Sequence, residues 1–187
     1  TVGIDISHYQ GTMNWVTAAA AGVTFAFMKA SQGVSYEDPQ FDTNYAGAGT
    51  NGIDRGPYHY FENDANPTTQ ANNFCAVISG KEGELGPVVD CEDETATLDP
   101  ADLKTFLDRV EVLTGLKCII YTRASWWNSY VGSQAWTPDY ALWVAHWGAA
   151  TPTLPTGWSS YSYWQYSSTG TASLYGAAGT NIDLDTV

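Results

Sequence analysis

The chain has 187 residues, a length typical of one domain with a sizeable buried core, so residues 1–187 are expected to form a single unit. Its 20 acidic and 7 basic residues give a formal net charge of −13, which argues against nucleic acid and anionic membranes as partners, because both require basic surfaces. A hydrophobic fraction of 44%, with 14% aromatic residues, excludes a disordered chain.

Eight apolar runs, taken in chain order, have the composition of β-strands. They span Val2–Ile6, Val23–Lys29, Gly56–Phe61, Pro87–Glu92, Cys118–Thr122, Ala141–Trp147, Ser162–Tyr166 and Asn181–Asp185. Several are almost wholly apolar, as in Val23–Met28, which is typical of parallel strands that are covered on both faces.

Four segments between the early strands carry helix signals. Thr12–Gly22 is rich in alanine and ends in a glycine suited to cap a helix. The other three begin with a capping residue followed by proline, at Asp38-Pro39, Asn66-Pro67 and Asp99-Pro100. In the last of them, apolar side chains recur at helical spacing over Ala101–Leu113, and Gly115 is expected to end the helix.

The order of these elements predicts a closed barrel. Strand starts at residues 2, 23, 56, 87, 118 and 141 leave room for helical crossovers between parallel strands. After the Thr- and Pro-rich stretch Thr151–Gly157, the last two strands follow one another without space for full helices. We therefore predict an α/β fold, a modified TIM-like (β/α)5(β)3 barrel in a single domain, with an open doubly wound sheet as the competing architecture.

The most informative stretch is the fourth predicted strand, Pro87–Glu92, which ends in acids. The alternation of side chains along a strand puts Asp90 and Glu92 on one face and Cys91 on the other. Catalytic groups of parallel barrels lie at the C-terminal ends of strands, and two neighbouring acids raise each other's pKa, so that one stays protonated while the other ionises. The competing interpretation is a solvated acidic loop, which is common in a chain this acidic.

Two further acids interrupt apolar strands. Asp5 lies inside Val2–Ile6 and Asp183 inside Asn181–Asp185, where burial without a partner is costly. If these acids had only structural roles, three distant strands would each need a buried acid for an independent reason. We therefore predict that Asp5 and Asp183 converge with the Asp90 and Glu92 pair on one catalytic site.

Other chemistries find little support. His8, His59 and His146 are scattered, and neither a zinc motif nor a phosphate- or dinucleotide-binding motif is present, so no metal and no cofactor are expected. The three cysteines form no CxxC pair and permit one disulfide, in which we expect Cys91 to pair with Cys75 or Cys118. No apolar run reaches the ~18 residues that a membrane span needs, and the composition favours a secreted protein.

Aromatic residues gather near the predicted strand ends. Tyr58 and Tyr60 share a face of the third strand, Tyr121 ends the fifth, and Trp143 and Trp147 lie on the sixth. Core packing explains most such residues, but Tyr and Trp around acids also suit sugar rings, which stack on aromatic faces. With carboxylates and no cofactor motif, glycoside hydrolysis is the reaction class that these residues favour.

Together these motifs resemble those of the glycoside hydrolase family 25 lysozymes, the Chalaropsis type of N-acetylmuramidase. The family signature is matched by Asp5-Ile6-Ser7-His8-Tyr9-Gln10-Gly11 and, after Gly22, by Phe27-Met28-Lys29-Ala30-Ser31-Gln32-Gly33 with Tyr36 and Asp38. The Asp-x-Glu motif, the Trp-Gln-Tyr strand and the late Asp of the family are matched by Asp90-Cys91-Glu92, Trp164-Gln165-Tyr166 and Asp183. Gln32 departs from the signature, which usually has Glu there; we expect altered substrate contacts rather than lost activity.

The resemblance implies a (β/α)5(β)3 barrel and hydrolysis of the β-1,4 bond between N-acetylmuramic acid and N-acetylglucosamine in bacterial peptidoglycan. It makes Glu92 the general acid. Asp90 either orients the substrate's 2-acetamido group as an internal nucleophile, with retention at the anomeric carbon, which we prefer, or stabilises an oxocarbenium ion directly. Asp5 and Asp183 set the pKa of the pair and hold the sugar. Weaker candidates for sugar contacts are Lys29, Tyr60, Tyr121 and Trp143.

Two other functions compete with this interpretation: a chitinase-like N-acetylhexosaminidase with the same acid pair, and a catalytically silent sugar-binding barrel. The expected partner is peptidoglycan, with neither nucleic acid nor membrane, and the lack of a coiled-coil or obvious sticky segment favours a monomer. The isoelectric point near 4.2 favours activity in acidic surroundings, where Glu92 is protonated.

Overall fold

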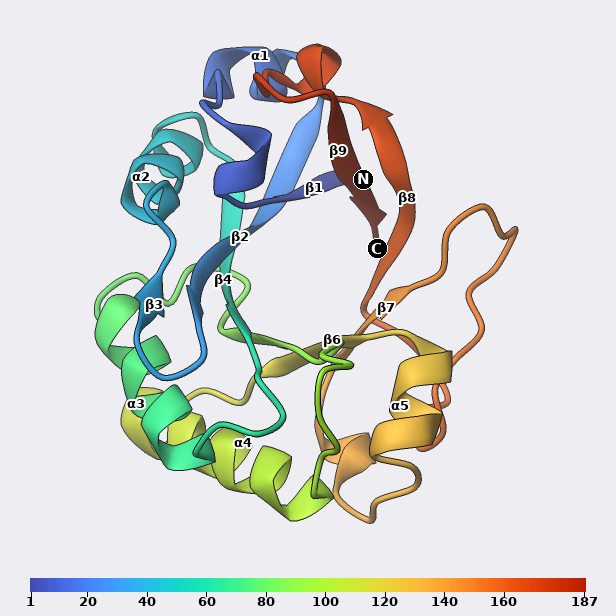
Figure 1. Cartoon of the computed structure of the whole chain (residues 1–187). Helices are drawn as coiled ribbons and strands as arrows, with labels where there is room; N and C mark the ends of the chain where they lie inside the picture. The colour runs from blue at the N-terminus through green and yellow to red at the C-terminus, as the bar shows by residue number, and fades with distance from the viewer.

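The computed structural model describes all 187 residues and shows one closed barrel with helices around it (Figure 1). The strands are β1 (Val2–Ile6), β2 (Val23–Gln32), β3 (Tyr36–Glu37), β4 (Asp54–Tyr60), β5 (Val88–Asp90), β6 (Ile119–Thr122), β7 (Leu142–Ala145), β8 (Tyr163–Thr171) and β9 (Asn181–Thr186). The helices are α1 (Trp15–Ala20), α2 (Phe41–Thr50), α3 (Pro67–Val77), α4 (Pro100–Thr114) and α5 (Ala124–Tyr130), with short 3-10 turns η1 (His8–Gln10), η2 (Thr137–Asp139) and η3 (Ala172–Tyr175). None of these helices has the length and apolar character needed to cross a bilayer.

Hydrogen bonding closes the sheet into a barrel. Neighbouring strands follow the order β1-β9-β8-β7-β6-β5-β4-β2, and β1 pairs with β2 to complete the ring. All pairings in the ring are parallel except those of β9, which runs antiparallel to both β1 and β8. The predicted (β/α)5(β)3 barrel is confirmed, and the open doubly wound sheet is wrong.

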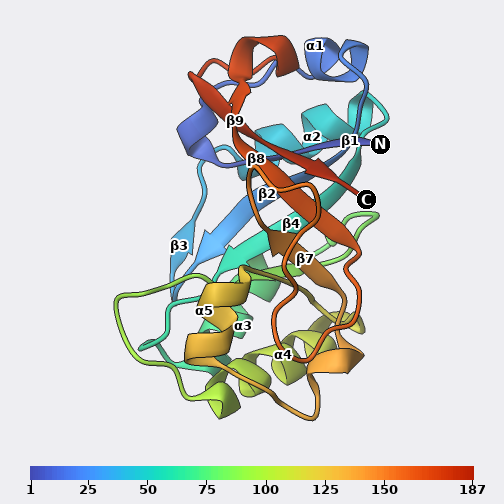
Figure 2. The same ribbon diagram turned by 90° about the vertical axis from the view of Figure 1, so that its right-hand side faces the viewer.

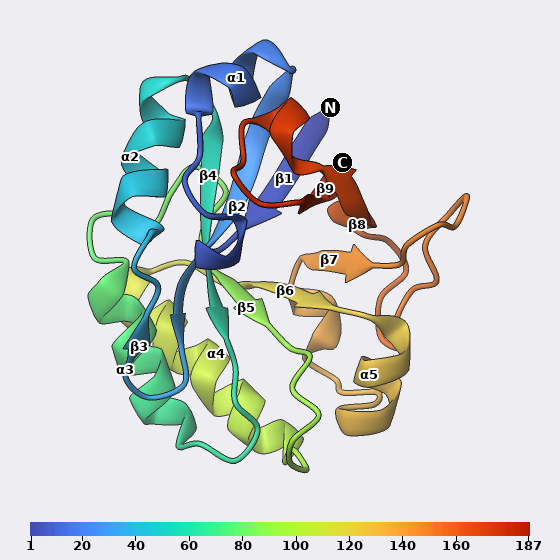
Figure 3. The same cartoon turned by 45° about the horizontal axis from the view of Figure 1, so that its top comes forward.

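Helices cover only part of the outer face of the barrel. Helices α2 to α5 alternate with the strands from β2 to β7, whereas Figure 2, which looks onto β8 and β9, shows no helix in front of those strands. The connection from β7 to β8 is a long loop that projects beyond the ring (Figure 3). The chain ends beside its start, where Thr186 Oγ1 donates to the carbonyl oxygen of Thr1 at 3.3 Å.

Most element boundaries agree with the predictions, and the exceptions have tertiary causes. Asn66 and Asp99 cap α3 and α4 as expected, and Gly115 ends α4 in the left-handed conformation. By contrast, α2 begins at Phe41 rather than after Asp38-Pro39. Asp38 still caps the turn before this helix, since its Oδ1 accepts the backbone N–H of Gln40 at 2.9 Å. Its Oδ2 lies 3.0 Å from the backbone nitrogen and 2.7 Å from the ring Nδ1 of His8.

Several strands also differ in length from the predictions: β7 ends at Ala145 rather than Trp147, and β8 continues to Thr171 rather than ending at Tyr166. β2 continues to Gln32 rather than ending at Lys29, because the short strand β3, which the sequence does not predict, pairs with its end. β5 ends at Asp90, so Glu92 lies just beyond the strand rather than within it. The end of β5 therefore leads directly into the loop that carries the second acid.

Aromatic rings fill the interior of the barrel. The side chains buried together there are Phe25, Phe27, Val88, Ile119, Tyr121 and Trp143. Trp143 stacks on Phe27 with ring centroids 4.1 Å apart. Glycine is required where strands approach these rings: a Cβ on Gly3 would lie 2.1 Å from the Phe25 ring, and one on Gly56 would lie 2.5 Å from the Phe27 ring. Because these side chains fill the barrel interior, open space for a site is left at the strand ends.

The predicted disulfide is absent. Cys75, Cys91 and Cys118 are all free thiols. Cys91 and Cys118 belong to the core between barrel and helices, which confirms that Cys91 faces away from the barrel interior. Burial raises the pKa of both thiols well above the usual value, so they stay protonated and act as small apolar core residues.

Candidate active site

A cavity of about 250 Å³ opens at the carboxyl ends of the barrel strands; we call it the acid cavity. Its lining residues are Asp5, Ile6, Ser7, Tyr9, Gln10, Lys29, Tyr58, Tyr60, Asp90, Glu92, Tyr121, Trp143, Gln165 and Asp183. The four acids that the sequence singles out, from distant strands, therefore lie in one cavity. All four side chains proposed as weaker sugar contacts line the same cavity.

The end of β5 supplies the two central acids. Asp90 is only 6% exposed, and its Oδ1 has no hydrogen-bond partner in the protein. Burial, followed by the charge of Glu92, raises the pKa of Asp90 well above the usual value. Burial also raises the pKa of Glu92, whereas the charge of Arg123 lowers it. The sequence predicted repulsion between the two acids. For Asp90, burial raises the pKa more than that repulsion does.

A second group of acids lies on the paired strands β1 and β9. Asp5 and Asp183 stand directly opposite each other, and Asp185 lies two positions beyond Asp183 on the same face. Burial, followed by the charges of Asp185 and Asp183, raises the pKa of Asp5 well above the usual value. The charge of Asp183 also raises the pKa of Glu92. The sequence interpretation missed Asp185, although its spacing from Asp183 repeats the spacing of Asp90 and Glu92.

Gln165 on β8 connects these acids to the aromatic lining. Its Nε2 donates to Asp5 Oδ2 at 2.7 Å. Its Oε1 accepts from the Tyr121 hydroxyl and from Trp147 Nε1, both at 2.9 Å. The sequence points to Gln165 only through the Trp164-Gln165-Tyr166 motif, without a role. These three hydrogen bonds connect Gln165 to β1, to β6 and to the loop after β7, and they hold its side chain in one position.

Lys29 is the one basic residue that lines the acid cavity. Its Nζ donates to Gln32 Oε1 at 2.6 Å and lies 5.1 Å from the ring centroid of Tyr60. Gln32 Nε2 in turn donates to Glu62 Oε1 at 2.9 Å. A glutamate at position 32 would set a second negative charge beside Glu62, whereas the amide bridges Lys29 and Glu62. Gln32 does not line the cavity itself, so its influence on a ligand passes through Lys29.

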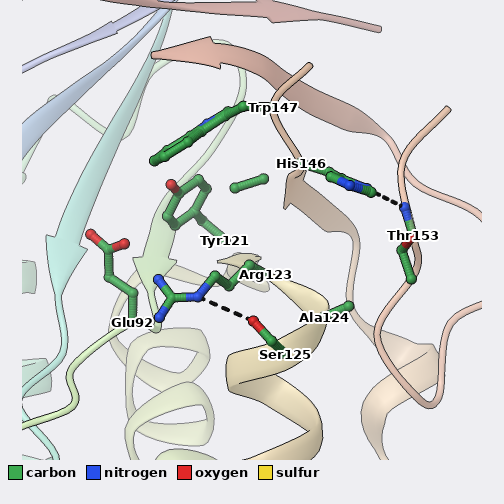
Figure 4. Close-up of a pocket in the computed structure, with 9 residues that line it drawn as sticks. Glu92, Tyr121, Arg123, Ala124, Ser125, His146, Trp147 and Thr153 are labelled. Carbon is green, nitrogen blue, oxygen red and sulfur yellow. Dashed lines mark hydrogen bonds between the residues drawn. The ribbon is translucent and has the colours of Figure 1, made fainter. Parts of the chain in front are cut away.

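A larger cavity of about 570 Å³ adjoins the acid cavity at Glu92 and Tyr121 (Figure 4); we call it the second cavity. Its other lining residues are Arg123, Ala124, Ser125, Ala145, His146, Trp147 and Thr153. The Trp147 ring is 56% exposed and is held by its bond to Gln165, whereas Trp143 is only 2% exposed. Trp147 therefore offers the accessible aromatic face that the sequence analysis sought in Trp143.

Polar groups surround the second cavity. Arg123 forms an ion pair with Glu94, and its Nε donates to Ser125 Oγ at 3.3 Å. His146 Nδ1 accepts the backbone N–H of Thr153 at 2.8 Å, so the neutral ring carries its proton on Nε2. Neither Arg123 nor His146 was predicted as a site residue, although both directly follow strand ends.

The free energy of unfolding is expected to fall as the pH rises from 6.5 to about 8. In this range an unfolded Asp185 is ionised, whereas the folded protein, in which burial raises the pKa of Asp185 to about 8, still holds the proton. The folded state binds more protons, so each such proton costs about 1.4 kcal/mol of stability per pH unit. His59, with its pKa lowered to about 3 by burial, has the opposite effect only below 6.5. Urea unfolding measures this slope, and stability that is constant or rising across the range contradicts it.

Comparisons with known proteins agree with this geometry. Residues 4–174 match the family described as Glycosyl hydrolases family 25. The chain is 37% identical to lysozyme M1 of Streptomyces globisporus, over 90% of this chain and 62% of that protein. It is 36% identical to the N,O-diacetylmuramidase of Chalaropsis sp., over 88% of this chain and 87% of that protein. The chain thus spans less than two thirds of lysozyme M1.

Solved structures show the same barrel. The bacterial lysozyme from Streptomyces coelicolor matches with a TM-score of 0.89 and 35% identity, covering 100% of this chain and 91% of that chain. A family 25 lysozyme from Aspergillus fumigatus matches with a TM-score of 0.84 and 27% identity, covering 100% of this chain and 93% of that chain. The likeness therefore includes the whole ring of strands that holds the acid cavity.

Proposed function

The chain belongs to the glycosyl hydrolases of family 25, and on this premise we propose that it is a lysozyme. It hydrolyses the β-1,4 bond between N-acetylmuramic acid and N-acetylglucosamine in bacterial peptidoglycan. The observation that carries this proposal is the meeting of Asp5, Asp90, Glu92 and Asp183 in one cavity at the carboxyl ends of the strands. The relatives named lysozyme and N,O-diacetylmuramidase support the same activity.

Glu92 is the general acid in this proposal. It lies where the two cavities join, so a glycan that passes through both places its scissile oxygen beside this carboxyl group. Burial raises the pKa of Glu92, which favours the protonated form that an acid catalyst needs. Glu92 gives its proton to the leaving oxygen as the bond from that oxygen to the anomeric carbon breaks.

Asp90 acts on the 2-acetamido group of the reacting sugar. Its Oδ1 lacks a donor in the protein, and the acetamido N–H is a donor that a carboxylate in the acid cavity can accept. That hydrogen bond favours the ionised form of Asp90 and leaves the proton of the coupled pair on Glu92. The acetamido carbonyl oxygen then attacks the anomeric carbon. Water, losing a proton to Glu92, opens the resulting ring with retention.

The second cavity takes the leaving sugar, because it begins at the acid that protonates the leaving oxygen. We expect Trp147→Ala to raise KM for cell-wall glycan roughly 2- to 10-fold, through loss of aromatic stacking, and to affect hydrolysis of an aryl glycoside, which lacks that sugar, less. Trp147→Phe, which keeps a ring, is expected to lie between wild type and the alanine variant. Val112→Ala, on the outer helix α4, serves as the control. Equal losses on both substrates would contradict this assignment.

Mass analysis of the ends released from purified peptidoglycan tests the proposed function. A reducing-end N-acetylmuramic acid supports it, whereas a reducing-end N-acetylglucosamine identifies a different bond and refutes it. Digestion of chitin with intact cell walls would instead support a chitinase-like N-acetylhexosaminidase. Binding of glycan without any cleavage would indicate a silent sugar-binding barrel.

We also propose that the protein acts outside the cell as a monomer, at acidic pH. Its proposed polymer substrate lies outside the cell membrane. The net charge of −13 shrinks in acid, which weakens repulsion from an anionic wall. Several acids of the site have raised pKa values, which keeps them protonated at mildly acidic pH. An optimum well above neutrality in the pH–rate profile would refute this part.

A further inference from the structure

Asp185 is a buried acid that the proposed mechanism does not use. It is 0% exposed and does not line the acid cavity, but it contacts two residues that do. The indole nitrogen of Trp143 donates to Asp185 Oδ1 at 2.8 Å. The carboxyl group of Asp185 is near enough to that of Asp5 for a hydrogen bond between them to raise the pKa of Asp5 and lower that of Asp185, and Asp5 has a similar contact with Asp183. In the β1–β9 pair, Asp185 stands opposite Gly3, two residues from Asp5 on the same face of β1.

Counting donors shows that this pair holds a proton. Asp5 Oδ2 accepts from Gln165 and Asp185 Oδ1 accepts from Trp143. Asp185 Oδ2 is fully buried and has no N–H or O–H partner elsewhere in the protein. Two carboxyl groups can bond to each other only when one of them is protonated. A proton held between Asp5 and Asp185 is therefore the one donor that satisfies the remaining oxygen.

The surroundings of the pair oppose the loss of this proton. The charges that act most on Asp5 and Asp185 come from acids, chiefly each other and Asp183, and no basic side chain is among them. Facing titratable groups on the other strands are Tyr58 on β4, Tyr121 on β6 and Tyr166 on β8. Two buried carboxylates without a cation would repel each other strongly.

We propose that Asp185 is a positioning residue for the hydrolysis proposed above: it shares a proton with Asp5 and holds the indole of Trp143. This inference rests on the proposed function. The shared proton limits the pair to one negative charge, which stays on Asp185 outside the cavity lining, so that an uncharged Asp5 faces Asp90, Glu92 and Asp183. The bond to the indole fixes Trp143, which stacks on Phe27 and forms part of the cavity lining.

Asp185→Asn tests the shared proton. The amide oxygen still accepts from Trp143, but the amide N–H donates to Asp5, which then becomes a charged acceptor. The pair keeps one negative charge, but that charge moves from Asp185 onto Asp5, which lines the acid cavity. There it raises the pKa of the neighbouring acids, so both limbs of the kcat/KM profile are expected to move upward by about one pH unit. Asp108→Asn, the same change on the exposed face of α4, is the control. A variant profile that superimposes on the wild-type profile would overturn the proposal.

Trp143→Phe tests the second contact. This variant keeps an aromatic ring but loses the indole donor and part of the ring volume, so KM is expected to rise while the limbs of the pH profile move less than in Asp185→Asn. A shift of the limbs in this variant equal to that in Asp185→Asn would overturn the assignment of the shift to the shared proton. The two readouts thus separate positioning of the ring from control of charge.

A measurement on the wild-type protein covers the case in which Asp185→Asn does not fold. Carbon-13 NMR of labelled aspartate carboxyl groups should show carboxyls in wild type that remain protonated above pH 6.5, where ordinary aspartates are ionised. Full ionisation of every aspartate by that pH would overturn the proposal. This readout needs no activity, so failure to hydrolyse cell walls would refute the proposed function and leave the shared proton to be decided by NMR.

Discussion

Glu92→Gln is expected to lower kcat on bacterial cell walls by about 10²- to 10⁴-fold. Glutamine has nearly the same shape but no proton to give to the leaving oxygen. The loss should appear in kcat more than in KM, because the glycan still contacts the remaining lining of both cavities. Turbidity loss and released reducing ends measure the effect, with Glu111→Gln on α4 as the matched control.

The same variant separates an enzyme from a silent sugar-binding barrel. Glu92 is partly exposed and accepts no hydrogen bond from the protein, so its neutral replacement should leave the folded structure and its melting temperature intact. A folded Glu92→Gln protein with undiminished activity would assign proton transfer to another group. It would thereby contradict the mechanism built on the junction of the two cavities.

Asp90→Asn is expected to reduce kcat by at least about 10²-fold, because an amide cannot act as the charged acceptor of the acetamido N–H. Removal of a neighbouring negative charge also lowers the pKa of Glu92, so the alkaline limb of the pH profile should move to lower pH. Kinetics on soluble peptidoglycan fragments across pH measure both effects. Asp108→Asn again serves as the control.

The role of the acetamido group has its own test. Wild-type protein should fail to cleave glycans in which the reacting sugar carries a free amine, because the internal nucleophile is then missing. Proton NMR of the first product should show the retained β-anomer. Cleavage of the deacetylated glycan at a comparable rate would instead indicate that Asp90 stabilises an oxocarbenium ion directly, and an inverted product would exclude the internal nucleophile.

Local patterns account for the parts of this protein that the sequence predicts correctly. The alternation of side chains predicted that Asp90 and Glu92 share a side and that Cys91 points away, and both acids line the acid cavity although β5 ends at Asp90. Helix caps at Asn66 and Asp99 depend on a few neighbouring residues, and they were predicted correctly. Crossovers of that length predicted parallel strands, and the lack of room for helices between the last strands favoured a barrel over an open sheet.

Predictions that depended on distant contacts were less successful. Asp38 caps the turn before α2 through the backbone N–H of Gln40, but its second contact, with His8 30 positions earlier, was not predicted. The disulfide expected for Cys91 is absent, since pairing depends on the positions of side chains rather than on their number. The hydrogen bond between Trp147 and Gln165 was not predicted, because it requires β7 and β8 to lie side by side.

The sequence by itself determined which acids could act, because charged residues inside apolar strands need a common polar site. Only the tertiary structure decided their protonation. Gln165 meets Asp5 across 160 positions of chain, and Trp143 meets Asp185 across 42. Burial and hydrogen bonding between such distant residues set each pKa, and neither quantity is encoded in the spacing of residues along a strand.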